Sequence, residues 1–429
     1  MHLSIVGSGY VGTTAAACLA AAGHQVTAID VDQAVVDAIN DGEAPIHEPG
    51  LADLVATHGG DRLTATTDHS AIRDTKVTLV AVPTPSTPDG SIDTSILEAA
   101  LTDVGSALES TVESHVVAIK STVVPSVIEE TVRPLLADSG ATLGEDLHVA
   151  TNPEFLREGS AVSDFQDPDK IVIGADSAFA ADRIAALYEP IIETADPAVI
   201  RTEPHTAMMI KYANNAFLAS KVSLINDIGN ICKEHEIDAY TIADALGQDH
   251  RISEHFLRSG LGWGGSCFGK DVAAISAAAR EHDYEPAMLD AAVEVNDHQP
   301  TRMLELMDRH TDVAGDRVAV LGLSFKPGTD DIRDTRAVPV IEGLRARDAS
   351  IAAYDPAAIE NMRERFPDLE YTADPEAALE DSVAALIVTD WEEIAALDGA
   401  FDRMRTPVVI DGRRAIDRRD GIVYEGLTW

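Results

Sequence analysis

Lysine is scarce in this chain of 429 residues, although charge is not. Eight lysines stand against 24 arginines and 73 acidic residues, and the formal net charge is -41. The acidic residues are spread along the chain, and we interpret them as an adaptation to a halophile's cytoplasm, because concentrated salt shortens the Debye length to about 3 Å near 1 M. With no basic footprint for phosphate backbones, nucleic acid is excluded as a partner. Half of the lysines lie in motifs described below, and the others are compatible with ordinary surface positions: Lys76, Lys170, Lys221 and Lys233.

Cysteines and long apolar runs are also few. Cys18, Cys232 and Cys267 are odd in number and widely spaced, which argues against a disulfide framework and a metal site. No run of about 18 apolar residues occurs, so no membrane span is expected. The first residues enter an apolar strand directly, without the basic region of a signal peptide. We therefore expect a cytoplasmic protein with reduced thiols and no metal ion.

The first domain begins with a strand, a glycine turn and a helix in the order typical of dinucleotide binding. Gly7, Gly9, Tyr10, Val11 and Gly12 form the turn, an alanine-rich run follows at 13–22, and a second strand at 26–29 ends at Asp30. The pattern predicts a pyrophosphate at the helix N-terminus and an acidic contact to the adenosine ribose, which favours NAD over NADP.

Further strands at 77–82 and 115–119 predict a doubly wound parallel sheet, whose ligands gather at the strand C-termini. Thr84 follows the first of these strands and Thr122 the second. The segments around Thr84 and Thr122 are also compatible with ordinary loops, or with a helix N-cap before Val127. Glu154 and Glu158 follow a strand at 147–150; they suit acid-base chemistry, or the solvated face of a helix.

A long helical pattern at 205–235 carries Lys211 and Asn215 four residues apart, on one face of a largely apolar helix. Burial there would suit the lysine to proton transfer. Further along, Cys267 stands among glycines, directly before Lys270 and Asp271 and a helical run. A thiolate is favoured at such a helix N-terminus, so Cys267 is the predicted nucleophile.

Alternating strands and helices resume after residue 313 and predict a second α/β domain. Phe325, Lys326, Arg333 and Arg413 lie near strand ends there, where a nucleotide phosphate or base is able to dock. The expected fold is therefore α/β, with two Rossmann-like doubly wound domains joined by a long central helix. The expected domains are an NAD-binding domain at 1–203, a helical central and dimerisation domain at 204–300, and a C-terminal α/β domain at 301–429.

Taken in order, these segments resemble the nucleotide-sugar 6-dehydrogenase family over nearly the whole chain. The resemblance also includes residues 45–50, 153–159, 264–267, 325–327 and 411–414. It implies a four-electron oxidation of a sugar C6 alcohol to a carboxylate with two NAD and one water. A Rossmann site alone explains the transfer of one hydride. The second hydride transfer requires that the aldehyde be held as a covalent adduct, and the thiol provides this.

By this resemblance, Lys211 and Asp271 assist deprotonation, and Cys267 forms a thiohemiacetal and then a thioester. Thr122 and Glu158 position or activate water, and Asn215 holds the oxyanion or water. Lys270 and Arg333 contact the cofactor, as do Thr84, Thr122 and Glu158. The residues implied in binding the UDP-sugar are Glu154, Phe155, Leu156, Arg157, Lys211, Asn215, Gly264, Lys270, Phe325, Lys326 and Arg413. Arg251 reaches the sugar of a neighbouring subunit, which implies a homodimer or a higher homo-oligomer.

Three residues depart from the family pattern: Val35 replaces a basic residue near the ribose, Gly269 replaces a proline, and Trp263 replaces a smaller aromatic residue. We expect UDP-glucose as substrate, and GDP-mannose and UDP-N-acetylmannosamine are the alternatives. A two-electron hydroxyacid dehydrogenase, in which Cys267 is incidental, and a nucleotide-binding regulator without turnover are further alternatives.

Overall fold

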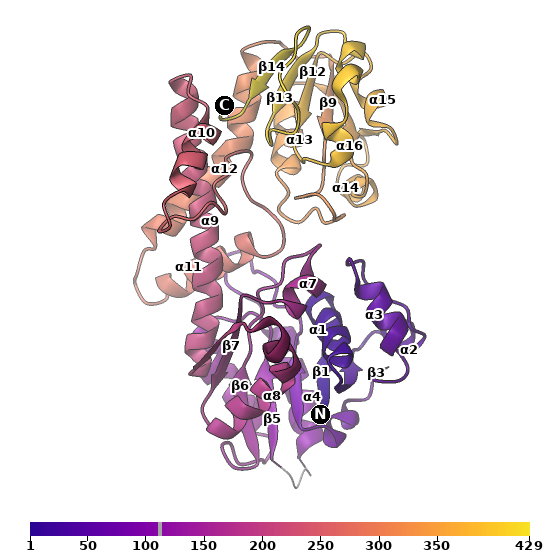
Figure 1. The fold of residues 1–429 in the computed structure, drawn as a ribbon, viewed down its shortest axis with the longest axis vertical. Coiled ribbons are helices and arrows are strands. Elements are labelled where there is room, and N and C mark those ends of the chain that lie inside the picture. The colour runs from indigo at the N-terminus through magenta and orange to yellow at the C-terminus, as the bar shows by residue number, and fades with distance from the viewer. Residues whose placement is uncertain (110–113) are drawn as a thin grey trace. The chain divides into compact units, whose positions relative to one another are not determined.

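The computed structural model describes residues 1–109 and 114–429, which fold as two compact units (Figure 1). Unit 1 comprises Met1–Asn214 with Ala273–Ala278, and unit 2 comprises Asn215–Val272 with Ala279–Trp429. Helix α9 (Pro204–Glu234) runs without interruption from the first unit into the second. No helix of the described residues is both long and apolar enough to cross a membrane.

Unit 1 is built on an eight-stranded sheet in the order β3-β2-β1-β4-β5-β6-β7-β8. The first six strands in this order run parallel, as predicted from the sequence, whereas β6 and β7 pair antiparallel, which the sequence did not indicate. The strands are β1 (His2–Val6), β2 (Gln25–Ile29), β3 (Leu63–Thr66), β4 (Val77–Val80), β5 (His115–Ile119), β6 (Leu147–Thr151), β7 (Lys170–Ala175) and β8 (Ala198–Thr202).

Helices cover both faces of this sheet because successive strand residues point to opposite sides and both sides are apolar. Leu3 and Ile5 of β1 pack into one buried cluster, whereas Val6 belongs to the cluster on the other face. The helices of unit 1 besides α9 are α1 (Tyr10–Ala21), α2 (Gln33–Asn40), α3 (Leu51–His58), α4 (Ser95–Leu108), α5 (Pro125–Val127), α6 (Arg133–Ala137), α7 (Ala161–Gln166) and α8 (Ala178–Ala195).

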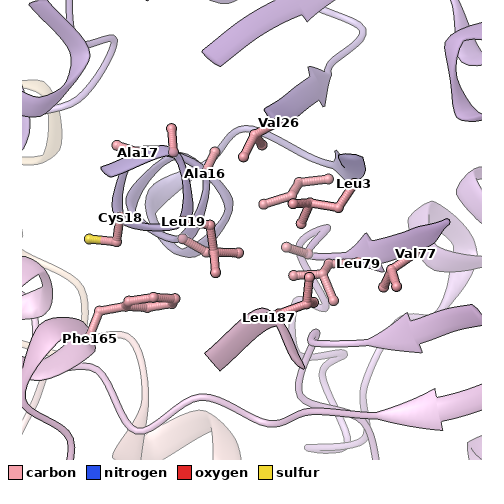
Figure 2. Close-up of a cluster of buried hydrophobic side chains, with 14 of the residues drawn as sticks. Leu3, Ala16, Ala17, Cys18, Leu19, Val26, Val77, Leu79, Phe165 and Leu187 are labelled. Atoms are coloured by element: carbon pink, nitrogen blue, oxygen red, sulfur yellow. The ribbon is translucent and has the colours of Figure 1, made fainter. Parts of the chain in front are cut away.

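The alanines of α1 let this helix approach the sheet closely. Figure 2 shows Leu19 of α1 on the side of the helix toward Leu3 and Leu79 of the sheet, with Phe165 next to the same helix near Cys18. Cys18 is 2% exposed in this cluster, and burial raises the pKa of its thiol to about 12. Cys18 is therefore a packing residue and not a nucleophile.

Unit 2 contains a six-stranded parallel sheet in the order β11-β10-β9-β12-β13-β14. Its strands are β9 (Arg317–Leu321), β10 (Ser350–Tyr354), β11 (Glu370–Tyr371), β12 (Ala384–Ile387), β13 (Val408–Asp411) and β14 (Val423–Gly426). Its helices are α10 (Ala239–Gly247), α11 (Phe268–Arg280), which runs on into unit 1, α12 (Ala287–Asp308), α13 (Ala337–Arg345), α14 (Ile359–Arg365), α15 (Pro375–Leu379) and α16 (Glu392–Ala395). The predicted fold class, two Rossmann-like domains joined by a long helix, is confirmed.

Candidate active site

The glycine turn lies between β1 and α1, and each glycine has a different reason for being there. Gly7 has a φ of +93°, and a Cβ on it would lie 2.7 Å from the carbonyl oxygen of Ala81. A Cβ on Gly12 would lie 1.8 Å from the carbonyl oxygen of Gly7, so only glycine allows this approach of helix and turn. Gly9 faces open space, which leaves room for a ligand above the start of α1.

The polar groups of this turn fit a dinucleotide. Asp30, at the end of β2, accepts a 2.6 Å hydrogen bond from the Ser8 amide. The buried Ser8 hydroxyl has no hydrogen-bond partner among the described residues, and Gly9 leaves the N-terminus of α1 without a side-chain cap. An anionic pyrophosphate would satisfy such donors. Val35, the departure near the ribose, packs against the core of unit 1.

Two threonines meet at the ends of the next strands. The Thr84 hydroxyl donates a 2.9 Å bond to the carbonyl of Thr122, so the segments after β4 and β5 are joined. The N-cap of α5 is Val124, so Thr122 does not cap that helix, and this alternative is wrong. Lys120 is buried and donates to Asn152 and Tyr188, which makes it a structural residue of unit 1.

Glu154 and Lys211 form a buried ion pair of 2.8 Å, in which the side chains are 8% and 3% exposed. Glu154 also accepts a 2.6 Å bond from the amide of Leu156. Burial opposes the charged form of Glu154, but the nearby Lys211 ammonium and these hydrogen bonds hold its carboxyl pKa below the ordinary value. Residues 152–157 form no helix, so the alternative of a solvated helical face is wrong for Glu154. Glu158 is half-buried and precedes α7.

Phe155 lies between two lysines, one of which has no role among the sequence predictions. The ammonium of Lys170 is 4.3 Å from the centre of the Phe155 ring, and that of Lys211 is 5.5 Å from it. Lys170 also donates a 3.0 Å bond to the side chain of Asn214. Its burial lowers its pKa, and the charge of Lys211 adds to this effect. The presence of Lys170 in a chain with so few lysines was the one feature of the sequence that could have indicated its place beside Phe155.

Glu48 is a second missed residue. It is 4% exposed and accepts hydrogen bonds from the Tyr10 hydroxyl and from the amides of Gly159 and Ala161. The motif at 45–50 was noted in the sequence, but nothing in its pattern indicated what the carboxylate contacts.

In unit 2, Cys267 directly precedes α11, as predicted. It is half-buried, its carbonyl accepts the 2.9 Å bond from the Asp271 amide that closes the first helical turn, and its sulfur lies 3.5 Å from the Ser266 hydroxyl. The unpaired amides at the start of a helix favour negative charge, so a thiolate at this position is stabilised by the backbone.

Asp271 contacts both Asn215, which is predicted to be catalytic, and Lys270, which is predicted to bind the cofactor. Its carboxylate is 1% exposed and accepts a 2.7 Å bond from Lys270 and a 2.6 Å bond from Asn215. Lys211 lies on α9 one turn before Asn215. The structure thus assembles Asn215, Asp271 and Lys270 in unit 2, and Glu154, Phe155 and Lys211 in unit 1.

The loop before Cys267 is held by the segment that carries Arg333. The Gly265 amide donates a 2.9 Å bond to the Arg333 carbonyl, and a Cβ on Gly264 would lie 2.1 Å from the Asp334 carbonyl oxygen. A Cβ on Gly265 would collide with the Phe325 ring at 2.7 Å. Gly269, the departure from proline, leaves space filled by the Asp334 carboxylate.

Trp263, the third departure from the family pattern, is a buried core residue. It is 8% exposed, donates to the Ser223 hydroxyl at 3.0 Å and packs edge-on against Phe268. The larger aromatic ring therefore fills the packing between α9 and α11 in unit 2.

The predicted cation Arg413 has its side-chain hydrogen bonds to backbone carbonyls. It donates to Val388 at 2.8 Å and Gly262 at 2.9 Å, and burial lowers its pKa. By contrast, three exposed arginines pair with nearby carboxylates: Arg157 with Asp164, Arg251 with Asp249, and Arg333 with Asp331. Lys326 lies over the ring of Phe325, 5.5 Å from its centre. No group of metal-ligating side chains occurs in the described residues.

The chain is similar to known proteins over its whole length. Models of the UDP-glucose/GDP-mannose dehydrogenase family match three parts of the chain: the NAD binding domain at 1–192, the central domain at 205–298 and the UDP binding domain at 319–418. The chain is 54% identical to UDP-glucose 6-dehydrogenase AglM of the halophilic archaeon Haloferax volcanii, over all of both chains. It is 38% identical to the UDP-glucose 6-dehydrogenase of Rhizobium meliloti, over all of this chain and 98% of that one.

A solved structure agrees. A UDP-glucose dehydrogenase from the hyperthermophilic archaeon Pyrobaculum islandicum has a TM-score of 0.90 and 37% identity, and the match covers 100% of this chain and 98% of that one. The fold and the matched domains define an NAD-binding dehydrogenase. The chain belongs to the UDP-glucose/GDP-mannose dehydrogenase family.

Proposed function

We propose that this enzyme oxidises UDP-glucose to UDP-glucuronate in two NAD-dependent steps, through a thioester on Cys267. The observation that carries the proposal is Cys267 at the start of α11, four residues before an Asp271 that is bonded to both Asn215 and Lys270. A dehydrogenase that stops at two electrons has no use for such a thiol.

The first oxidation removes a hydride from C6 and the proton from its hydroxyl. Lys211 and Asp271, acting through water, assist the loss of the proton and stabilise the oxygen that carries the developing charge. The Gly7–Gly12 turn and Asp30 would hold the nicotinamide cofactor, which when bound would supply the hydride acceptor for both oxidations. Arg333, Lys270 and Thr84 are assigned to contacts with the same cofactor.

The second oxidation needs a covalent adduct. The Cys267 thiolate adds to the aldehyde carbon, the carbonyl oxygen takes up a proton, and a thiohemiacetal forms. Loss of a hydride from carbon and a proton from oxygen gives the thioester. Water, positioned by Thr122 and Glu158, then adds to the thioester carbon and expels the thiolate. We assign to the Asn215 side-chain amide the hydrogen bond that stabilises the oxyanion of this step, and the product is a carboxylate.

The sugar nucleotide is assigned to Glu154, Phe155, Leu156 and Arg157 of unit 1, and to Gly264, Phe325, Lys326 and Arg413 of unit 2. Arg413 supports this assignment, because within the described residues its guanidinium bonds to two carbonyls and to no carboxylate, which leaves donors for a diphosphate. UDP-glucose is preferred over GDP-mannose and UDP-N-acetylmannosamine because both relatives described above carry its name.

We further propose a homodimer. Phe217, Leu224 and Ile231 recur every seven residues on α9 and are 71%, 59% and 56% exposed, which is unusual for large apolar side chains. A second copy of this helix would bury them and bring Arg251 to the neighbouring subunit. The domain limits at 203 and 300 and the cytoplasmic location stay predictions.

The testing experiment measures NADH released per UDP-glucose consumed in molar potassium chloride, with GDP-mannose and UDP-N-acetylmannosamine in parallel. A ratio near two with UDP-glucose is expected. A ratio near two with another sugar only would identify that sugar as the substrate. A ratio near one would make Cys267 incidental. No NADH from any sugar would favour a nucleotide-binding regulator.

The matched variant is Cys267→Ser, with Cys18→Ser as the control because Cys18 is buried in the core of unit 1. Cys267→Ser is expected to stop at the aldehyde or after one hydride, while the control keeps the full stoichiometry. Full production of the carboxylate by Cys267→Ser would refute the thioester route.

A further inference from the structure

Glu48 is a buried anion whose partners are all hydrogen-bond donors without charge. Its Oε1 accepts a 2.7 Å bond from the Ala161 amide, and its Oε2 accepts a 2.8 Å bond from the Gly159 amide. The Tyr10 hydroxyl donates to the same Oε2. Within the described residues no cation forms an ion pair with Glu48. A buried carboxylate in such surroundings needs every one of these bonds, because each one lost leaves a desolvated charge less compensated.

These bonds connect three segments that are far apart in sequence. Tyr10 is the first residue of α1, directly after the glycine turn of the cofactor site. Glu48 belongs to the segment before α3, and Gly159 and Ala161 lead into α7. The Tyr10 hydroxyl also accepts a 3.0 Å bond from the Gly159 amide, so the three segments share one network. Burial and the Glu48 carboxylate both raise the pKa of Tyr10, so its phenol keeps the proton that it donates.

The loop between Glu154 and Gly159 is therefore fixed at both ends. At its first end Glu154 is held by Lys211 and by the Leu156 amide. At its other end Gly159 is held by Glu48. We propose above that Glu158 positions the water of thioester hydrolysis. Glu158 is the residue directly before Gly159, so its backbone position depends on the hydrogen bond between Gly159 and Glu48.

We propose that Glu48 is a positioning residue, which holds Glu158 in register with the glycine turn through Gly159, Ala161 and Tyr10. This inference rests on the proposed function only for the role of Glu158; the anchoring itself stands on the geometry of unit 1. Glutamine cannot replace Glu48, because one of its two terminal atoms is a donor and would face a backbone amide or the Tyr10 hydroxyl. A displacement of about 1 Å at a catalytic group costs on the order of 100-fold in rate.

The test compares the full-length wild type with Glu48→Gln and Tyr10→Phe, and uses Glu43→Gln as the matched control. Glu43 lies in the same segment but is exposed. Hydrogen exchange is measured first, without substrate or cofactor. Glu48→Gln is expected to speed exchange of the amides in 157–162 by tenfold or more, and to leave the strands of unit 2 unchanged. Tyr10→Phe is expected to give a smaller increase in the same peptide.

The kinetic readouts separate positioning from loss of fold. Glu48→Gln is expected to lower kcat at least tenfold, with the KM for UDP-glucose within twofold of wild type. Acid quench and mass spectrometry should show a larger fraction of Cys267 carrying the thioester, because hydrolysis is the slowed step. Tyr10→Phe is expected to lower kcat by a smaller factor and to raise the KM for NAD.

Exchange and kcat of Glu48→Gln equal to those of Glu43→Gln would overturn the proposal. A lower kcat without extra thioester would overturn the link to Glu158. If Glu48→Gln does not fold, Tyr10→Phe decides, and wild-type exchange and kcat in that variant would overturn the proposal. Absence of NADH from wild-type enzyme would instead refute the proposed function, and the exchange measurement would still test the anchor.

Discussion

The two sheets begin with the same turn, and the two turns are used differently. Gly7 follows β1 and Gly322 follows β9, and each has a φ of +93°. Each donates a 2.8 Å bond to the end of the second strand, Gly7 to Ile29 and Gly322 to Tyr354. A Cβ on either glycine would collide with a residue that follows the fourth strand of its unit, Ala81 after β4 or Thr389 after β12. The glycine is therefore a requirement of the strand crossover itself and not, by itself, a mark of a dinucleotide.

The acidic residue after the second strand separates the two cases. Asp30 is half-buried, and within the described residues it accepts bonds from the amides of Ser8 and Asp32 alone. Asp355 is 1% exposed, and its carboxylate is saturated by bonds from the amides of Leu323 and Ser324, the indole of Trp391 and the amides of the following turn. Asp30 keeps capacity for a ribose, whereas Asp355 is committed to the fold.

The chain after the turn differs as well. In unit 1, α1 begins at Tyr10, and Gly12 lets it approach the turn closely. In unit 2, α13 begins only at Ala337, and the intervening segment carries Phe325, Lys326 and Arg333. In unit 1 the turn is thus followed by a helix N-terminus, whereas in unit 2 it is followed by a segment with aromatic and basic side chains. This difference suits two different ligands.

The largest expected effect comes from Gly12→Ala, because the new Cβ would overlap the Gly7 carbonyl, which is backbone and cannot move away cheaply. Affinity for NAD should fall by about 100-fold or more, since the turn and α1 must separate. Calorimetric titration with NAD and with UDP checks this, and UDP binding should be retained. Gly9→Ala is the control for stability, because its Cβ meets open space. Wild-type NAD affinity in Gly12→Ala would contradict the account of the turn.

The two aspartates should respond in opposite ways to conversion to asparagine. Asp355→Asn is expected to cost about 3 kcal/mol of unfolding free energy, because an NH₂ group would face buried donors. Asp30→Asn should cost less than about 1 kcal/mol but weaken NAD binding roughly tenfold. Denaturant unfolding and NAD titration of both variants check the contrast. Equal effects on stability would erase the distinction between the two turns.

Acid should weaken unit 1 before unit 2. Burial lowers the pKa of His115 from 6.5 to about 4, so its stabilising contribution is present above 6.5 and is lost as the pH falls toward 4. The loss amounts to about 3 kcal/mol. Burial instead raises the pKa of Asp411, so that contribution is present below the ordinary 3.8 and is lost as the pH rises through the folded value.

Thermal unfolding from pH 7 to 4 measures this difference. His115→Gln should flatten the pH dependence of the unit 1 transition, while His205→Gln should not, because His205 is half-exposed. A slope unchanged by His115→Gln would assign the acid sensitivity to other groups.

The smallest expected effect concerns two serines. Ser324→Ala removes bonds to Asp355 at 3.1 Å and Trp391 at 3.2 Å, and should cost about 1 kcal/mol. Ser8→Ala removes a hydroxyl without a partner in the described residues, so stability should change by less than about 0.5 kcal/mol. NAD affinity should nevertheless fall a few-fold, and unchanged affinity would show that Ser8 does not contact the cofactor.

The sequence predicted what depends on periodicity and on local turn chemistry. The glycine turn, the strands at 115–119 and 147–150 and the thiol before a helix were all predictable, because each is encoded within a few neighbouring residues. The antiparallel pairing of β7 was not, because strand direction depends on how the chain returns to the sheet. The partners of Glu48 and Lys170 were also hidden, since their hydrogen bonds reach residues 38 or more positions away.

None of the eight lysines is fully exposed: Lys120 and Lys211 are buried, and the other six are half-buried. Even Lys221 and Lys233 donate to backbone carbonyls, of Ile252 and Trp429. Amine-directed reagents, including the common lysine cross-linkers, should therefore label the folded protein poorly. Carboxylate-directed coupling will be the productive chemistry for immobilising or cross-linking it, and a sudden gain of amine labelling will report that the fold has opened.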